Sequence, residues 1–167
     1  MHDELTQKDI DKMREEIEHR TKVLRPELIE EVKRTRAFGD LSENFEYKAA
    51  KREKNRNESR IRYLENMIKT AHVISDRSEA DTVGLFDRVE VYIPEDDETQ
   101  QIQVVTTVRC DPLNGLISKE SPFGKAVLGR RVGDRITVQA TEDYSYEAVI
   151  RSIEKTEDDG SAPLLQY

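Results

Sequence analysis

The sequence has little of what several large classes of protein require. Among 167 residues there is one cysteine, Cys110, and no tryptophan. A single cysteine excludes an internal disulfide framework and a zinc site made of thiolates. No apolar run approaches the roughly 20 residues that cross a bilayer, and the N-terminal stretch MHDELTQKDI is too polar for a signal peptide. We therefore expect a cytoplasmic protein that has no contact with a membrane.

Charged residues are abundant and unevenly distributed. The formal net charge is −8, from 27 Lys and Arg against 35 Asp and Glu. Residues 1–75 hold 17 basic and 16 acidic side chains, whereas residues 76–167 hold 10 and 19. Because phosphates repel an acidic surface, any contact with nucleic acid is expected in the first half.

The first half has the apolar spacing of two long helices. Apolar residues recur with a spacing close to that of a coiled-coil seam over residues 6–38 and again over about 42–70. Thr6 and Asp9 are expected to cap the first helix, and Pro26 to kink or break it locally. Only a short connection remains, so the two helices are expected to fold back as an antiparallel hairpin.

The facing surfaces of this hairpin are expected to be partly polar. Folding at residues 40–43 places Asn57 near Leu28 and Lys54 near Glu31. Polar residues in the seam of a coiled coil weaken its packing. We therefore expect the half next to the turn to be less well packed.

From about residue 81 the apolar period changes to two, which is typical of strands. This pattern predicts strands at 88–93, 101–105, 135–140 and 144–153. Ser121-Pro122 is typical of the start of a helix, and Gly129 ends it.

The predicted fold class is therefore α+β, with three parts. Residues 1–76 form the antiparallel α-helical coiled-coil hairpin. Residues 77–156 form a small antiparallel sheet domain with one short helix. Residues 157–167 form a polar tail that we expect to be frayed.

The expected turn of the hairpin, GDLSENFEY at residues 39–47, carries three carboxylates and no base. Asp40 and Glu43 have the spacing of a capping box, which stabilises a helix start. Alternatively, clustered carboxylates suit Mg²⁺, provided that a partner supplies further ligands. The spacing by itself leaves both explanations open.

Four basic residues follow the turn on one face of the second helix. Lys48, Arg52, Arg56 and Arg60 are four residues apart, and like charges at that spacing disfavour an isolated helix. The face is either solvated and paired with glutamates across the hairpin, or it holds the phosphates of a nucleic-acid strand.

Several stretches resemble the bacterial transcript cleavage factors of the GreA/GreB family, with GreA as the closer subgroup. The matches follow one another in order from about residue 5 to 155. They are LRPELIEE (24–31), GDLSENFEY (39–47), AAK (49–51), DPLNGLIS (111–118), SPFGKAVLG (121–129) and VGD (132–134).

This resemblance implies an FKBP-like fold for the C-terminal domain and bacterial RNA polymerase as the partner. Glu120, Ser121 and Pro122 match the family's docking loop, which binds at the rim of the polymerase secondary channel, although a helix cap explains Ser121 equally well. The coiled coil then enters the channel. We expect a monomer.

The resemblance also implies that Asp40 and Glu43 are the catalytic acids. They help to hold a second Mg²⁺, shared with the polymerase and bound weakly by the free protein, and they position a water. Backtracked nascent RNA is then cut near its 3′ end. If the basic face of the second helix binds nucleic acid, we expect Lys48, Arg52 and Arg56 to hold the RNA phosphates. The protein then stimulates the polymerase's own cleavage activity and is not itself an enzyme.

Three alternatives remain open on the sequence. An inhibitory paralogue would occupy the channel without productive cleavage, and the extra carboxylate Glu46 favours it. A peptidyl-prolyl isomerase or chaperone would use the FKBP-like fold with a pocket of convergent aromatic side chains. A structural coiled-coil adaptor would leave the acidic turn unexplained.

Overall fold

The long helices lie in the first half of the chain and the five-stranded sheet lies in the second half. In the computed structural model, which describes residues 3–39 and 44–166, the chain divides into two units. The first holds Ile10–Ala71, and the second holds Asp3–Asp9 together with the described residues from His72 onward. The sequence predicts a boundary between residues 76 and 77; in the structure residues 3–9 and 72–76 group with the sheet.

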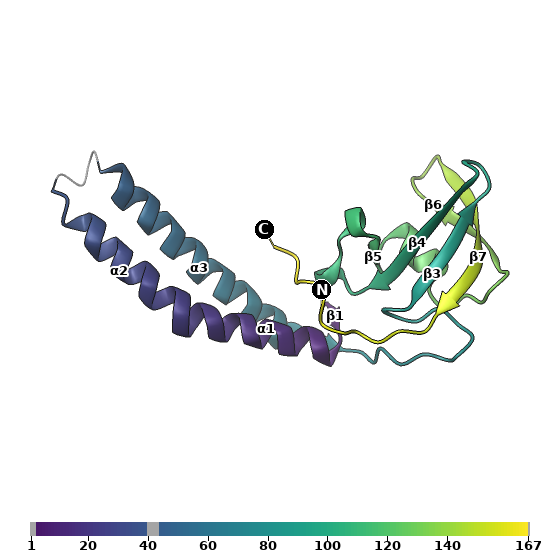
Figure 1. Cartoon of the computed structure of the whole chain (residues 1–167), viewed down its shortest axis with the longest axis horizontal. Coiled ribbons are helices and arrows are strands. Elements are labelled where there is room, and N and C mark those ends of the chain that lie inside the picture. The colour runs from purple at the N-terminus through teal and green to yellow at the C-terminus, as the bar shows by residue number, and fades with distance from the viewer. Residues whose placement is uncertain (1–2, 40–43, 167) are drawn as a thin grey trace. The chain divides into compact units, whose positions relative to one another are not determined.

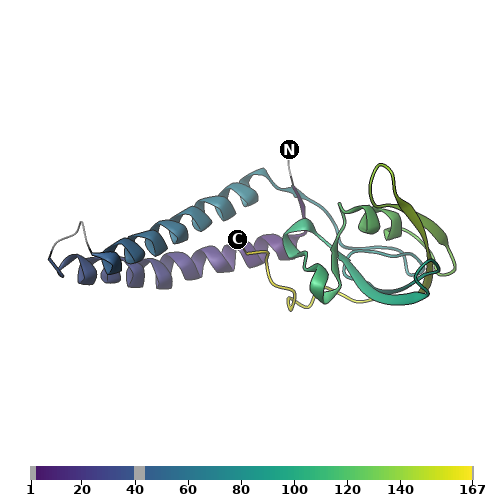
Figure 2. The ribbon, with the colours of Figure 1, turned by 90° about the horizontal axis from the view of Figure 1, so that it is seen from above.

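Among the described residues, three α-helices and one π-helix build the helical arms. They are α1 (Gln7–His19), the π-helix η1 (Arg20–Leu24), α2 (Arg25–Arg36) and α3 (Phe45–Thr70). The arms overlap near α1 in Figure 1 and near the turn in Figure 2, which is the view rotated by 90°. They therefore wind around each other, and the predicted antiparallel helical hairpin is confirmed.

The disturbance predicted at Pro26 takes the form of the π-helix. Pro26 lies in the first turn of α2, directly after η1. Because proline has no backbone N–H, it cannot donate to the carbonyl of Lys22 four residues earlier. The N–H of Arg25 instead donates to the carbonyl of Arg20, five residues earlier. The first arm thus continues through Pro26 with wider turns and does not break.

The residues that face each other in the hairpin differ from the prediction. Asn57 Nδ2 donates to the carbonyl oxygen of Arg20 at 3.2 Å, and Arg20 Nη1 donates to Asn57 Oδ1 at 3.0 Å. The predicted position of Asn57 beside Leu28 is therefore wrong. α2 ends at Arg36 and α3 begins at Phe45, so the connection is centred between residues 40 and 41. The π turns of η1 also hold more residues than α turns, which shifts the register further.

The apolar packing of the hairpin is concentrated in the half away from the turn. Its buried apolar side chains are Ile10, Met13, Ala50, Ile61 and Leu64. Along α2, which leads to the turn, the one buried residue is Thr35. This distribution agrees with the polar seam that the sequence predicts for the distal half.

A five-stranded sheet forms the centre of the second unit. Its order is β5-β4-β3-β7-β6, and its strands are β3 (Arg88–Ile93), β4 (Glu98–Val105), β5 (Leu116–Ser118), β6 (Arg135–Gln139) and β7 (Ser145–Glu154). Neighbours are antiparallel except β4 and β5, which are parallel. The predicted sheet is confirmed, and the short parallel strand β5 is an addition to it.

Smaller elements complete this unit. They are the parallel pair β1 (Glu4–Leu5) and β2 (His72–Val73), the 3₁₀ turns η2 (Thr107–Arg109) and η3 (Pro112–Asn114), and the predicted short helix, α4 (Pro122–Val127). The core lies between α4 and the sheet, where Val127 and alternate strand residues such as Val89 and Val91 are at most 1% exposed.

The C-terminal residues pack against the second unit. Asp158, Ala162 and Leu164 are buried, although no helix or strand forms there. The N–H of Leu165 donates to the carbonyl oxygen of Val108 at 2.7 Å. The prediction of a frayed tail is therefore wrong for residues 158–165, because these side chains find partners within the unit.

Candidate functional site

The two predicted catalytic acids, Asp40 and Glu43, lie outside the described residues. On one side of them α2 ends at Arg36, and Gly39 has a φ of +100°. This backbone conformation favours glycine and stops a helix. On the other side α3 begins at Phe45. Both acids therefore belong to the connection between the two arms of the hairpin.

Asn44 fixes the start of α3 and joins it to the end of α2. Its Oδ1 accepts from the N–H of Tyr47 at 2.9 Å, which makes Asn44 the N-cap of α3. Its Nδ2 donates to the carbonyl oxygen of Thr35 at 2.6 Å. The N-cap of α3 is thus Asn44. The capping-box spacing predicts the N-cap at Asp40, four residues earlier. The predicted capping box with Asp40 as the N-cap of α3 is therefore wrong, because the N-cap is Asn44.

Cations lie over aromatic rings on both sides of the connection. Phe38 and Phe45 are 52% and 78% exposed, so the rings present apolar surface beside the charges. The three pairs are Arg34 over Phe38 at 5.2 Å, Arg36 over Tyr47 at 5.7 Å and Lys48 over Phe45 at 5.7 Å, each measured to the ring centroid. The hydrogen bond that Arg36 donates to the hydroxyl of Tyr47 lowers the pKa of that tyrosine.

Three of the four residues of the predicted basic stripe are exposed on α3. These are Lys48, Arg52 and Arg56, the predicted RNA-binding residues. Arg56 is paired with Glu53, with 3.0 Å between Nη1 and Oε1. Because an exposed ion pair contributes little free energy, another anion can readily replace Glu53. The inclusion of Arg60 in the stripe is wrong, because its side chain is 6% exposed.

Arg60 instead belongs to a polar cluster between the arms. Glu16 Oε1 accepts from Arg20 Nε at 2.8 Å and from Arg60 Nε at 2.9 Å, and Glu16 Oε2 accepts from Arg60 Nη2 at 3.3 Å. Burial raises the pKa of Glu16, but the hydrogen bonds from Arg60 and Arg20 outweigh it, so the pKa lies below its ordinary value. This cluster is part of the hairpin's interior and is not available to a ligand.

The described residues contain no group of three or more Asp, Glu, His and Cys side chains arranged to hold a metal ion. The fit of Mg²⁺ to this turn therefore depends on donor chemistry. Asp40 and Glu43 supply carboxylates three residues apart, and Mg²⁺ takes carboxylate ligands few at a time while it retains waters. That donor set suits a shared Mg²⁺ site.

The predicted docking residues surround the start of α4 in the second unit. Ser121 Oγ accepts from the N–H of Gly124 at 3.0 Å and donates to the carbonyl of Ser118 at 2.7 Å, so Ser121 is the N-cap. Pro122 occupies the first turn, and Glu120 is exposed beside it. A Cβ added to Gly124 would lie 2.0 Å from the Ser118 carbonyl oxygen, which requires glycine there. These bonds define the conformation of the loop, while the half-exposed Glu120 carboxylate pairs with Lys119 and Lys125 at its surface.

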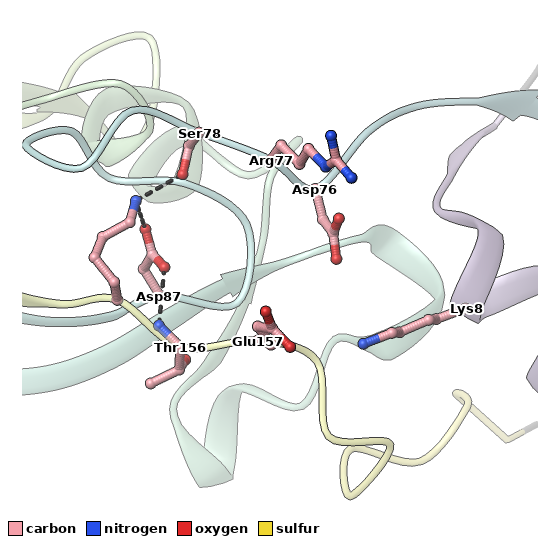
Figure 3. A pocket seen from close by; sticks show the side chains of 8 residues that line it. Lys8, Asp76, Arg77, Ser78, Asp87, Thr156 and Glu157 are labelled. Carbon is pink, nitrogen blue, oxygen red and sulfur yellow. Dashed lines mark hydrogen bonds and ion pairs between the residues drawn. The ribbon is translucent and has the colours of Figure 1, made fainter.

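The sequence analysis missed a polar centre in the second unit, which Figure 3 shows. A cavity of about 510 Å³ is lined by Lys8, Asp76, Arg77, Ser78, Asp87, Lys155, Thr156 and Glu157. Lys155 Nζ lies 2.5 Å from Asp87 Oδ2 and 2.6 Å from Ser78 Oγ, and it donates to two backbone carbonyls as well. Lys155 thus ties the loop before β3 to the end of β7. No aromatic side chain lines this cavity, so it lacks the pocket that the isomerase alternative needs.

Comparison with known proteins identifies relatives of both units. The family model described as "Transcription elongation factor, N-terminal" matches residues 4–73, and the model described as "Transcription elongation factor, GreA/GreB, C-term" matches residues 78–155. Within the described parts of the chain, no helix combines the length and apolar character that crossing a membrane requires.

Curated relatives are similar along most of their length. Transcription elongation factor GreA of Mesoplasma florum is 40% identical over 145 residues, 86% of this chain and 93% of that protein. GreA of Geobacillus kaustophilus is 44% identical over 136 residues, 81% of this chain and 86% of that protein. A solved structure of the transcription factor Gfh1 aligns with 93% of this chain and 99% of its own, at 28% identity and a TM-score of 0.45.

Proposed function

Because the chain belongs to the GreA/GreB family of transcription elongation factors, we propose that it binds bacterial RNA polymerase and stimulates hydrolytic cleavage of backtracked nascent RNA. The observation that carries this proposal is the end of the hairpin. Two acids stand on a connection whose helix cap is already supplied by Asn44, and exposed cations follow on α3. Since Asn44 occupies the N-cap position, the capping box does not explain the spacing of the two acids, and a role in the reaction does.

Asp40 and Glu43 would be this protein's ligands to a second Mg²⁺ in the polymerase active centre. When bound there, Mg²⁺ makes a water more acidic and stabilises charge on the phosphate being cut. The two carboxylates orient that water by accepting its hydrogens. The remaining ligands come from the polymerase, so this protein assists the catalysis of another and is not an enzyme by itself.

Exposed cations on α3 hold the RNA. Lys48, Arg52 and Arg56 are on the exposed side of the helix that leads away from the turn. When these side chains neutralise phosphates, the counterions bound to the RNA are released. The affinity of this contact therefore falls as the salt concentration rises. Phe45, 78% exposed, offers a flat surface on which an unpaired base stacks.

Docking is assigned to Glu120, Ser121 and Pro122 in the second unit. The cap hydrogen bonds of Ser121 and the fixed backbone of Pro122 preorganise the loop, which lowers the entropy lost on binding. The acidic charge of residues 76–167 suits a basic rim on the polymerase. We expect the protein to act as a monomer in the cytoplasm, where its partner is found.

The test is cleavage of RNA in a stalled, backtracked elongation complex with Mg²⁺. Asp40→Asn and Glu43→Gln preserve size and remove one charge each, and either is expected to lower the cleavage rate by about a hundredfold or more, which corresponds to about 2.7 kcal/mol. The matched control is Glu46→Gln, the same change on the exposed first turn of α3, with a much smaller effect expected.

Two further measurements separate chemistry from folding. Polymerase binding by the Asp40 and Glu43 variants is expected to stay unchanged, and a higher Mg²⁺ concentration is expected to restore part of their rate. Near-normal cleavage by both variants contradicts the proposal. Cleavage that is absent even with the unmodified protein, together with normal binding, would identify an inhibitory paralogue; the GreA names of the curated relatives do not favour that alternative.

A further inference from the structure

Arg109 is a fully buried cation whose partners come from both ends of the second unit. Its side chain is 0% exposed. Nε donates to the carbonyl oxygen of Ala162 at 2.6 Å, and the two Nη atoms donate to the carboxylate of Asp158 at 3.0 and 2.7 Å. Nη1 also donates to Asp9 Oδ1 at 3.0 Å. Three of these four bonds therefore go to C-terminal residues, and a buried guanidinium without them would be poorly compensated.

The C-terminal residues lie on the unit as a bound peptide lies on its receptor. Asp158, Ala162 and Leu164 are 5%, 9% and 7% exposed, whereas Asp159 and Ser161 between them are exposed. The main chain is held as well, because the N–H of Leu165 donates to the carbonyl oxygen of Val108. A charged anchor, buried apolar side chains and main-chain bonds are the features by which extended peptides are recognised.

Lys8 secures the beginning of this segment. Its Nζ donates to the carbonyl oxygen of Asp158 at 2.7 Å. In Figure 3 the Lys8 side chain extends toward Glu157, across the cavity that both residues line. The segment begins just past residue 155, where the family model ends. It is therefore an addition to the part of the chain that defines the family.

The bonds of Arg109 also connect this segment to the start of α1. Asp9 Oδ1 accepts from Arg109, while Asp9 Oδ2 accepts from the N–H of Thr6 at 3.0 Å. The N–H of Asp9 donates in turn to Thr6 Oγ1 at 3.2 Å, which completes a capping box with both residues buried. Without the C-terminal contacts, the carboxylate partner of Arg109 among these residues would be Asp9, which also accepts the capping bond from Thr6.

From these contacts we infer that the second unit carries a peptide-binding site centred on Arg109, and that residues 157–165 of the same chain are its ligand. The site selects an extended peptide with an aspartate anchor followed at four and six residues by small and branched apolar side chains. Its occupation keeps residues 3–9 ordered, since the same guanidinium holds Asp9. The C-terminal segment thus stabilises the N-terminal capping box of α1 through Arg109.

The test uses the full-length chain with Asp158→Asn, and Asp159→Asn as the matched control, because the neighbouring Asp159 is exposed. Amide hydrogen exchange is measured at pH 7. In the Asp158 variant we expect the amides of Thr6 and Leu165 to exchange at least tenfold faster, and in the control we expect changes within twofold. Leu164→Ala, which leaves the charges intact, is expected to change the same amides in the same direction.

A synthetic peptide of residues 156–166, TEDDGSAPLLQ, then probes the site directly. Added to the Asp158→Asn chain, it is expected to restore slow exchange at Thr6, whereas the same peptide with asparagine at the position of Asp158 should bind at least tenfold more weakly. Equal exchange in the two variants, or equal rescue by the two peptides, overturns the inference. Protection of the unmodified chain that falls on dilution also overturns it, because the ligand would then come from a second copy.

Discussion

Replacing Glu16 by Gln is expected to destabilise the hairpin strongly, although the change removes no volume. The side chains of Glu16, Arg20 and Arg60 are 17%, 20% and 6% exposed, so their charges are largely withdrawn from water. The single oxygen of Gln can still accept from the Nε atoms of Arg20 and Arg60. Its NH2 group replaces Oε2, which accepts a hydrogen bond from Arg60 Nη2 at 3.3 Å, and so that bond is lost. The variant thus removes the carboxylate charge that the guanidinium groups of Arg20 and Arg60 share.

The size of the effect follows from the hydrogen bonds that change. A bond to a charged group contributes about 1.5–3 kcal/mol and a neutral one about 0.5–1.5 kcal/mol. Removing one partner of a fully buried pair costs about 3–5 kcal/mol, and the partial exposure of Glu16 places it below that range. We expect a loss of about 2–3 kcal/mol, which lowers the melting temperature by roughly 8–24 °C at about 4–8 °C per kcal/mol for a small domain.

The measurement is thermal unfolding of the full-length chain followed by circular dichroism at 222 nm, because the helical signal reports mainly on the hairpin. The matched control is Glu18→Gln on the same helix. Glu18 and Lys22 form an i,i+4 pair whose side chains are 63% and 71% exposed, so no resolvable change is expected there. Equal melting temperatures for the two variants would refute the assignment of stability to the Glu16 cluster.

The stability difference between the unmodified chain and Glu16→Gln is expected to depend on pH. The pKa of Glu16 in the folded protein lies below its ordinary value of 4.5, because the bonds from Arg60 and Arg20 outweigh the effect of burial. A lowered folded-state pKa gives stability that is complete above the unfolded value and is lost as the pH falls through the folded value. The difference between the unmodified chain and Glu16→Gln should therefore be constant above about pH 5 and shrink below pH 4.5. A difference that grows on acidification would contradict this account.

Three further changes test other parts of the structure. Arg52→Ala with Arg56→Ala should weaken capture of backtracked RNA, most at low salt, because rising salt screens the same contacts in the unmodified protein, while cleavage at saturating protein survives; equal loss at every protein concentration would indicate misfolding. Asn44→Ala removes the N-cap of α3 and should cost about 1 kcal/mol of hairpin stability in urea unfolding. Gly124→Ala places a Cβ 2.0 Å from the carbonyl oxygen of Ser118, so it should lower the melting temperature of the second unit and weaken polymerase binding; an unchanged melting temperature would show that the loop yields.

Strand periodicity was a reliable guide where one face of an element is buried. β3 spans residues 88–93, as the alternation predicts, because Val89, Val91 and Ile93 all point into the core. The cap at Thr6 and Asp9 and the short helix after Ser121 also follow from local chemistry. Such features depend on residues at most four apart, so the sequence contains nearly all the information that determines them.

The pairing between the two arms depends on more distant information. Asn57 faces Arg20, and not Leu28, because the position of the turn and the wider turns of η1 both shift the register. The sequence gives little indication of which residues polar side chains such as Asn57 and Arg20 will face, since Asn and Arg also occur at many surface positions. Their specificity becomes visible only when both partners are known.

The most consequential residues that the sequence did not reveal are two buried arginines, and they share a physical reason. Arg60 donates to Glu16, 44 residues away, and Arg109 donates to Asp9 and Asp158, 100 and 49 residues away. Arginine and aspartate are usually exposed, so periodicity assigns them to the surface. Yet an apolar side chain at either position would accept many neighbours, whereas a buried guanidinium is satisfied only when specific carboxylates arrive with the right geometry. These clusters therefore select which segments pack together, a choice that the apolar pattern of the chain leaves open.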